Sequence, residues 1–444
     1  MFQKNVKFAM GVTMKFRRVL LIIMVLGIGM ISGCKANNSS DVPVSENTLE
    51  DSDKKVEKCS YDIDKYKTKL DASRKAIDEC REVYADECAQ VKNADYKNLD
   101  FSECDFSEFP DITDVSVFSN SYRGMTEQEA LELIENWLKS IGKSEFENIK
   151  QQIFVISANY NLDETKEYPY CYRTISEQTP NFSAGDAVFC DTSDFYIMID
   201  SNGIQSVSDG KIAKYLKREY AHVDVNHENY DVEETGTLEE MGSKEYPLIV
   251  GTLSVFEGAD LVTKYFEQKN FFPCQNEMKL EVVEVRVLRI GDVYGYDYLV
   301  RRVYKNVPFA YWDTGYFYVD QGYMPEGDII HAFVVDDTGV SAFVTGTSPS
   351  TILTPLYTDD KIINLDNALN ILYEKLAKQL SVKVDTVDFV YMPFSFSESE
   401  KLTDIVSFPC WEFKGINTRK NEKICIYVDA FTGDVRYYTM RNEE

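Results

Sequence analysis

The sequence has few of the residues on which most catalytic and metal sites depend. Only three of its 444 residues are histidines, and its ten cysteines include no CxxC or CxxxC pair of the kind that binds zinc or carries out redox chemistry. We find no P-loop, no GxGxxG and no HExxH motif. The residues therefore indicate no cofactor and no metal, and enzyme chemistry has little support.

Basic residues are also in deficit. The 47 lysines and arginines face 74 aspartates and glutamates, so the formal net charge is −27. A protein this acidic is repelled by nucleic acid and by anionic lipid surfaces, which excludes both as electrostatic partners. The 44% of apolar residues is enough to bury real cores, and the length suggests two or three domains.

Long apolar runs are missing outside the first residues of the chain. Residues 1–18 carry five basic residues and no acidic one, and the apolar run Val19–Ile31 follows them. A run of 13 residues falls short of the ~20 that a membrane-spanning helix needs. This order of a basic region, a short apolar region and small residues predicts a secretory signal over residues 1–33.

The end of that segment, Ile31-Ser32-Gly33-Cys34, resembles the lipobox of bacterial lipoproteins. The resemblance implies cleavage between Gly33 and Cys34 and a diacylglyceryl group on the thiol of Cys34. Two acyl chains are enough for stable anchoring, so the lipid bilayer becomes a partner and the outer face of the cell membrane the location. An ordinary cleaved signal and an uncleaved anchor are the alternatives, and both leave the rest of the chain outside the cytoplasm. Met14 is a second candidate for the start.

Nine cysteines follow Cys34, an odd number that cannot pair fully within one chain. Cys410 and Cys425 fall on segments that we expect to be neighbouring strands. The sequence leaves open a bridge between these two and buried free thiols, because a free cysteine packs as a small apolar residue.

One block of sequence occurs three times. Each copy opens with a predicted helix, two of them at the capping boxes Thr126–Glu129 and Ser254–Glu257 and the third near Asn364. Apolar residues then alternate in the manner of strands. The predicted strands are residues 152–158, 168–177 and 195–199, then 280–290 and 296–304, then 386–392, 406–414 and 424–428.

Each copy closes on the same phrase, in which apolar residues and an aspartate lead into a turn with glycine. The phrases are Ile199–Ile204, Val335–Val340 and Val428–Val435. Asp begins and Gly ends many tight reversals, because Gly tolerates positive φ. The distances from helix start to that glycine are 77, 85 and 69 residues (126 to 203, 254 to 339, 364 to 433). We therefore predict an α+β protein of tandem modules, each with one helix packed on an antiparallel sheet.

The predicted organisation has seven parts. The parts are a lipoprotein signal peptide (1–33), a flexible tether (34–58), a partly helical N-terminal segment (59–118), module 1 (119–228), an acidic linker (229–246), module 2 (247–351) and module 3 (352–444). Within the N-terminal segment, residues 62–91 lack Pro and Gly and are expected to be a helix.

The modules resemble the PepSY-like families, which include protease propeptides and YycH/YycI-type extracytoplasmic regulators. The segment from Arg301 to Phe309 is similar to a propeptide strand, with Asn306 where glycine is usual, and Pro409–Phe413 is similar to a second family motif. The chain also resembles Gram-positive lipoproteins of unassigned function. The resemblance implies a non-enzymatic protein that binds or regulates an extracytoplasmic protein or peptide. A glycan- or solute-binding lipoprotein and an unrecognised hydrolase are the alternatives.

A crowded aromatic segment in module 2, residues 307–323, is the candidate binding site. We expect Trp312 and Tyr316 to contact the partner, with local positive charge from Arg301 and Arg302 beside them. An exposed sheet edge of the same module could capture a peptide by strand addition. The alternatives are that the loop covers its own core and that the arginines pair with acids of the preceding strand.

Two further patterns mimic catalytic or metal sites. Asp313 and Asp337 each begin an Asp-Thr-Gly triplet, as in aspartic proteases, but they are 24 residues apart and the second lies in the repeated turn phrase. We interpret them as turns. His222 and His227 frame a short segment with Asp224, yet strand alternation places the two imidazoles on opposite faces, which suits chelation poorly. A solvated strand edge is the expected structure there.

Overall fold

A computed structural model of the chain describes residues 61–94, 96–121, 126–143, 153–156, 172–174, 187–192, 194–200, 203–218, 221, 230–267, 277–311, 317–318, 324–325, 329–345, 352–376, 379–395 and 405–440. In these ranges the protein is α+β, with few helices and mostly antiparallel sheets. This agrees with the predicted fold class. No helix in the described ranges is both long and apolar enough to cross a membrane.

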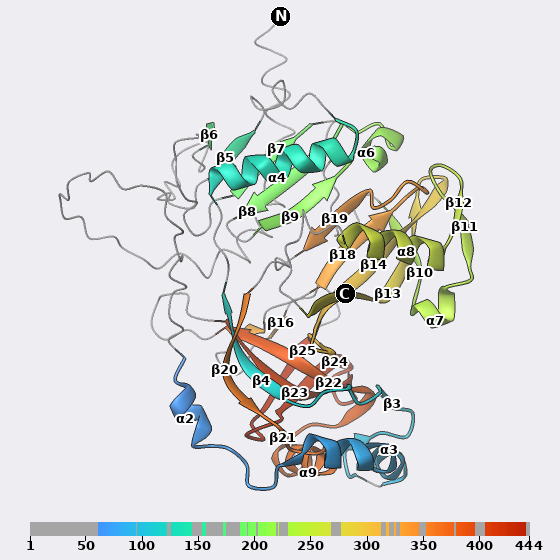
Figure 1. Ribbon diagram of the computed structural model, residues 1–444. Coiled ribbons are helices and arrows are strands. Elements are labelled where there is room, and N and C mark those ends of the chain that lie inside the picture. The colour runs from blue at the N-terminus through green and yellow to red at the C-terminus, as the bar shows by residue number, and fades with distance from the viewer. Residues whose placement is uncertain are drawn as a thin grey trace, which may run out of the picture.

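An eleven-stranded antiparallel sheet fills the upper half of the molecule (Figure 1). Its strands, in spatial order, are β10 (Asp231–Gly236), β13 (Met278–Ile290), β14 (Val293–Tyr304), β18 (Ile329–Val334), β19 (Ala342–Thr345), β9 (Gly203–Ser208), β8 (Tyr196–Asp200), β7 (Ala187–Asp191), β5 (Phe154–Ile156) and β6 (Tyr172–Thr174), with β15 (Val307–Pro308) paired to β14. The predicted modules 1 and 2 both contribute to it. They are joined where β9 pairs with β19, so two of the modules share one sheet rather than having a sheet each.

Helices α4 (Glu127–Ser140) and α8 (Val255–Phe266) pack on one face of this sheet (Figure 1). Both begin with the predicted capping box, because Thr126 and Ser254 accept from the backbone of the residue three positions later. The apolar stripe of each helix is buried with the strands that it covers. At Gly258 a Cβ would lie 2.1 Å from the Tyr298 hydroxyl, so glycine is needed where α8 approaches β14.

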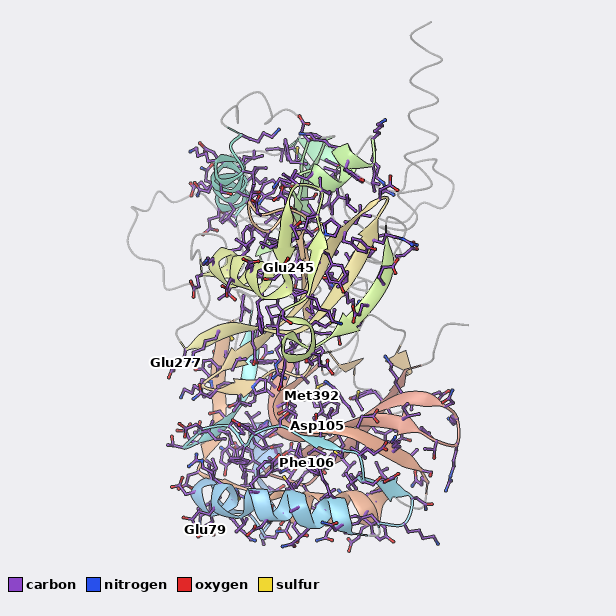
Figure 2. The ribbon with its side chains drawn as sticks, turned by 90° about the vertical axis from the view of Figure 1, so that its right-hand side faces the viewer. Glu79, Asp105, Phe106, Glu245, Glu277 and Met392 are labelled. Carbon is purple, nitrogen blue, oxygen red and sulfur yellow. The ribbon has the colours of Figure 1, made fainter. Side chains whose placement is uncertain are left out.

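A ten-stranded sheet fills the lower half. Its strands are β16 (Phe317–Tyr318), β25 (Val435–Met440), β24 (Glu422–Asp429), β23 (Ile405–Asn417), β22 (Val382–Ser395) and β17 (Met324–Pro325) in one path, with β2 (Leu99–Asp100), β3 (Asp105–Phe106), β4 (Val115–Ser121) and β20 (Ile352–Asp359) attached. Helices α3 (Ile77–Asn93) and α9 (Leu365–Leu376) lie together against its core (Figure 1). Figure 2 shows Asp105, Phe106 and Met392 in this half, and Glu245 and Glu277 in the other.

The N-terminal segment belongs to this second sheet. Strand β4 pairs with both β20 and β23, and β2 and β3 pair with β22. The short strand β1 (Lys75–Ala76) pairs with β21 (Lys361–Ile362) in a separate two-stranded sheet. The expected helix over residues 62–91 is therefore divided into α2 (Ile63–Lys67) and α3. The amide of Asp71 donates to the carbonyl of Phe431, a long-range bond that a continuous helix could not make.

The expected acidic linker, residues 229–246, is also folded. It contains β10, α7 (Leu238–Met241) and the start of a two-stranded hairpin of β11 (Glu245–Pro247) and β12 (Thr252–Ser254). Thr237 and Glu240 form a further capping box at α7. The short helix α6 (Lys211–Tyr215) lies on the other face of the eleven-stranded sheet, where Ile212 packs with Phe333 and Leu288.

Candidate functional site

Arg301 joins the two sheets. It lies on β14, on the face that looks away from α8, and its Nε is 3.1 Å from Glu281 Oε2. Its Nη1 is 3.2 Å from Oδ2 of Asp388 on β22 of the ten-stranded sheet. Burial acts to lower the pKa of Arg301, but the two carboxylates outweigh it and hold that pKa above its ordinary value. The expected pairing with an acid of the preceding strand is present at Glu281.

Arg302 points to the opposite side of β14 and is 1% exposed. The carbon of its guanidinium lies 4.6 Å from the centroid of the Phe309 ring, a stacked cation–π contact. Arg301 and Arg302 therefore lie on opposite faces of β14 and do not form one positive patch. Consecutive residues of a strand point to opposite faces, so two adjacent arginines cannot present one patch.

Trp312 and Tyr316, the two aromatic residues chosen as partner contacts, lie outside the described residues. The residues just before them pack against the ten-stranded sheet: Phe309 is fully buried beside Tyr391, and the amide of Ala310 donates to the Tyr391 carbonyl. After them, β16 pairs with the end of β25. The described start of this aromatic segment is therefore buried up to Ala310, and the contact of Trp312 and Tyr316 with a partner stays a prediction.

A second ion pair lies beside Tyr311. Lys414 Nζ is 3.0 Å from Glu412 Oε2 and 4.1 Å from the centroid of the Tyr311 ring. The Tyr427 hydroxyl donates to Glu412 Oε1 at 2.6 Å. Burial acts to lower the pKa of Lys414, yet Glu412 and Tyr311 keep it raised. Together with Arg301, Asp388 and Glu281, these groups form what we call the junction cluster, in which each cation is held by a carboxylate.

His331 on β18 and Asp297 on β14 form a buried pair that sequence reasoning missed. His331 Nδ1 is 2.9 Å from Asp297 Oδ2, and both side chains are less than 5% exposed. The ring of His331 stacks over Phe333, and its Nε2 has no hydrogen-bond partner among the described residues. The contact at Nδ1 fixes the orientation of the imidazole between β14 and β18. A lone histidine 34 residues from its partner gives no sequence signal.

Two of the repeated turn aspartates are structural anchors. Asp336 accepts from the amide of Thr338 at 2.9 Å, and its Oδ2 is 2.8 Å from Lys211 Nζ of α6. Burial works to raise the pKa of Asp336, but Lys211 and Thr338 hold it below its ordinary value. Asp337, the first residue of the Asp-Thr-Gly triplet, is exposed, so this triplet is a turn as expected. Asp313 lies outside the described residues.

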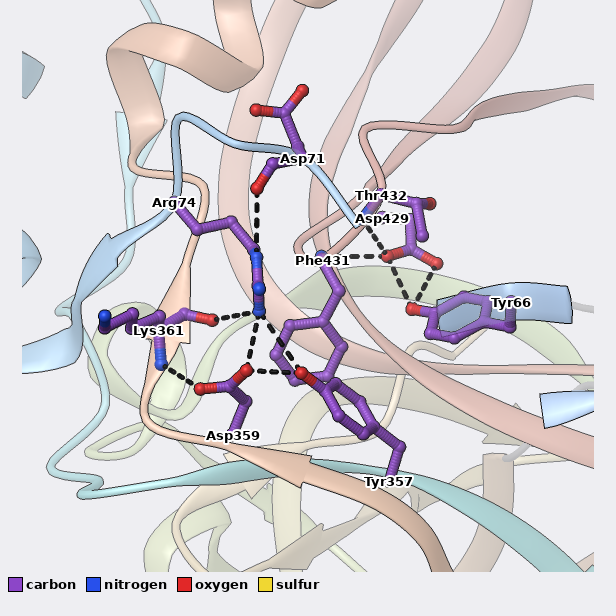
Figure 3. A network of polar contacts seen from close by, with 9 residues as sticks. All are labelled: Tyr66, Asp71, Arg74, Tyr357, Asp359, Lys361, Asp429, Phe431 and Thr432. Carbon is purple, nitrogen blue, oxygen red and sulfur yellow. Dashed lines mark hydrogen bonds and ion pairs between the residues drawn. The ribbon is translucent and has the colours of Figure 1, made fainter. Parts of the chain in front are cut away.

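The third turn aspartate, Asp429, anchors the N-terminal segment (Figure 3). The hydroxyl of Tyr66 donates to Asp429 at 2.9 Å, and the amides of Phe431 and Thr432 donate to the same carboxylate. Arg74 makes a second link nearby, with its Nη1 2.7 Å from Asp359 Oδ2. Cys410 and Cys425 also lie in this sheet, on the neighbouring strands β23 and β24. Both are free, because Cys410 is opposite Asp429 and Cys425 is opposite Lys414.

Strand β10 is one end of the described eleven-stranded sheet. Among the described residues β10 pairs only with β13. Every residue of β10 is exposed or half-buried, and Val232 is 39% exposed. The carboxylates of Asp231 and Glu233 are 72% and 37% exposed and share Arg289. The exposed strand β10 can bind an added strand, whereas the buried ion pairs described above link different segments of this same chain.

No metal site is present among the described residues, since they contain no group of three or more His, Cys, Asp or Glu placed to hold an ion. The segment with His222, Asp224, Asn226 and His227 lies outside them.

No protein-family model matches the chain, and no curated protein matches it in sequence. Among solved structures it is similar to the crystal structure of an uncharacterised protein from Eubacterium rectale, at 14% identity and a TM-score of 0.42, over 78% of this chain and 90% of that one. It is also similar to the YpeB C-terminal domain from Bacillus megaterium, at 13% identity and a TM-score of 0.28, over 72% of this chain and 100% of that one. Likenesses this distant carry no functional argument, so function is inferred from the chain itself.

Proposed function

We propose that this chain is a membrane-anchored extracytoplasmic lipoprotein that binds another protein or peptide and has no catalytic role. The basic n-region, the short apolar run and the lipobox ending at Cys34 support the anchor and the location on the outer face of the cell membrane. We further propose that the blocks beginning at α4, α8 and α9 are copies of one PepSY-like module, since each helix is followed by a hairpin closed on an Asp–Gly turn.

The observation that carries the binding function is the accessible edge of β10. An edge strand presents unpaired N–H and C=O groups, and an extended peptide can satisfy them by adding a strand. The other accessible edge foreseen from the sequence, next to Arg301, is occupied: β14 has β13 on one side and β18 and β15 on the other.

Site-specific photocrosslinking in intact cells tests this function. A photo-reactive residue is placed at Val232 on β10 and, as a matched control, at Val83 on α3, which is 37% exposed against 39% for Val232. We expect a discrete protein adduct at Val232 and none at Val83. Equal labelling at both positions, or none at Val232, would show that β10 is not the binding edge.

The anchor has its own test. Cys34→Ser should release the protein into the medium or leave an unprocessed precursor, because no thiol remains for the diacylglyceryl group. Incorporation of radiolabelled fatty acid checks this directly. Continued incorporation in the variant would show that Cys34 is not the lipidation site.

A further inference from the structure

The chemistry of β10 also selects the kind of partner. Building on the proposed function, we propose that the occupant of the β10 edge is an extended segment of a partner protein that carries lysine or arginine, and that it adds as a strand beside Asp231 and Glu233.

The backbone of β10 determines how an added strand would bind. In an edge strand, alternate residues direct their N–H and C=O groups away from the sheet, so the six residues of β10 offer about three such positions. The register with β13 shifts between Val232 and Glu234, which leaves Glu233 as an extra residue in a bulge. A bulge at the middle of the strand limits the added strand to a short segment.

The side chains on and near β10 determine which charge an added strand would carry. Residues 231–247 contain six acidic residues and one lysine, and Arg289 of β13 is the cation bound by Asp231 and Glu233. Counting Arg289, the local charge is −6 + 2 = −4. Glu234 is already engaged by Lys244 and by the hydroxyl of Tyr246, so it is not the group that would meet a partner.

Asp231 and Glu233 differ from Glu234, because among the described residues their only cation is Arg289, which is 50% exposed and binds both. One guanidinium therefore serves two carboxylates. A basic side chain on an added strand would supply the missing charge, and an acidic one would be repelled.

The same charges exclude a second copy of this chain as the occupant. Pairing β10 with β10 of another molecule would bring Asp231 and Glu233 opposite like charges, on a protein whose net charge is already −27. Charged edge strands are a common protection against self-association. The β10 edge therefore disfavours pairing with a second copy of this chain and favours a strand that carries lysine or arginine.

The test measures binding of a ten-residue peptide of alternating lysine and threonine to the detergent-solubilised full chain by fluorescence anisotropy. Two relatives of the peptide serve as probes, one with glutamate in place of lysine and one with alternate backbone nitrogens methylated. Hydrogen exchange of the β10 amides locates the bound peptide. The variant Asp231→Asn/Glu233→Gln removes the two carboxylates, and Asp78→Asn/Glu79→Gln on α3 removes two exposed carboxylates elsewhere as the control.

We expect the lysine peptide to bind and to protect β10 amides, and the glutamate peptide not to bind. Methylation should weaken binding at least about tenfold, because each lost backbone hydrogen bond contributes. The β10 variant should lose roughly three- to tenfold in affinity and the α3 variant nothing beyond twofold.

Equal binding of the methylated peptide would show a charged surface without strand addition. Equal binding of the glutamate peptide, protection outside β10, or a dimer that forms through β10 would each overturn the proposal. An adduct at Val232 with a partner segment that lacks basic residues would leave the proposed binding function intact and refute only the basic occupant. Absence of any adduct there would refute the function itself.

Discussion

Replacing Tyr66 by Phe isolates the bond that holds the N-terminal segment to the C-terminal sheet. Tyr66 is 3% exposed, and its hydroxyl lies 2.9 and 3.0 Å from the two oxygens of Asp429, which is 1% exposed (Figure 3). Phenylalanine keeps the ring contact with Phe408, whose centroid is 5.5 Å away. The substitution therefore removes one hydrogen bond and little packing.

The cost follows from the charge of the acceptor, so it applies at a pH above the pKa of Asp429, which burial raises. A hydrogen bond to a charged group contributes about 1.5–3 kcal/mol, against about 1 kcal/mol for a bond between neutral groups. Asp429 keeps the amides of Phe431 and Thr432, so we expect Tyr66→Phe to cost about 2 kcal/mol. The comparison variant is Tyr84→Phe. Tyr84 is 8% exposed, its hydroxyl donates to the neutral carbonyl of Ser107 at 2.8 Å, and its loss should cost about 1 kcal/mol.

Native-state hydrogen exchange measures both variants strand by strand. The free energy of opening of the β22, β23 and β24 amides should fall by about twice as much in Tyr66→Phe as in Tyr84→Phe, while β13 and β14 remain unchanged. Equal losses in the two variants would refute the reasoning, because they would mean that the carboxylate of Asp429 adds nothing to the bond. A loss that spreads equally to β13 and β14 would refute the placement of Tyr66 against the ten-stranded sheet alone.

Three further outcomes follow from buried charges and thiols. Burial raises the pKa of Asp191 to about 7, so the folded state holds a proton that the unfolded state has lost above pH ~4, and wild-type stability should fall as pH rises from 4 to 7. In urea unfolding, Asp191→Asn should therefore gain about 1–2 kcal/mol at pH 8 and nothing at pH 4. This gain is smaller than the ~4 kcal/mol of a shift of three pKa units, because the side chain is partly exposed. Arg301→Ala removes the cation that pairs with Asp388, so it should cost about 2 kcal/mol of stability and split the calorimetric unfolding into two transitions. A single unshifted transition would contradict the role of Arg301 as a link between the sheets. Burial raises the pKa of Cys425 to about 12 and that of Cys410 well above its ordinary value, so neither thiol should react with Ellman's reagent at pH 8 until the protein unfolds; rapid labelling of the native protein would show that these strands open.

Local patterns predicted local structure well. The capping boxes at Thr126 and Ser254 start α4 and α8, because the bonds that define a cap join residues three positions apart. The turn phrases lie between paired antiparallel strands for a similar reason: at Asp336 the side chain bonds to the amide two residues on, and at Asp429 to the amides two and three residues on.

Local patterns misled where a long-range partner decided the structure. Residues 231–236 look like linker because their acids do not alternate with apolar residues, yet their backbone pairs with β13. Residues 68–76 lack helix breakers, but Asp71 bonds to Phe431 and β1 pairs with β21, so the helix is broken there. Propensity is a weak preference that such contacts override.

The amino-acid sequence by itself thus determined the class of the fold, the starts of its main helices and the positions of its turns, because those depend on periodicity and on bonds between near neighbours. Only the tertiary structure decided that β9 pairs with β19, that β4 completes the C-terminal sheet, and that β10 is an end strand of the described eleven-stranded sheet. It also decided that Asp297 meets His331. Backbone hydrogen bonds between distant strands are almost independent of side-chain identity, so the order of strands in a sheet is set by how whole surfaces pack rather than by any motif.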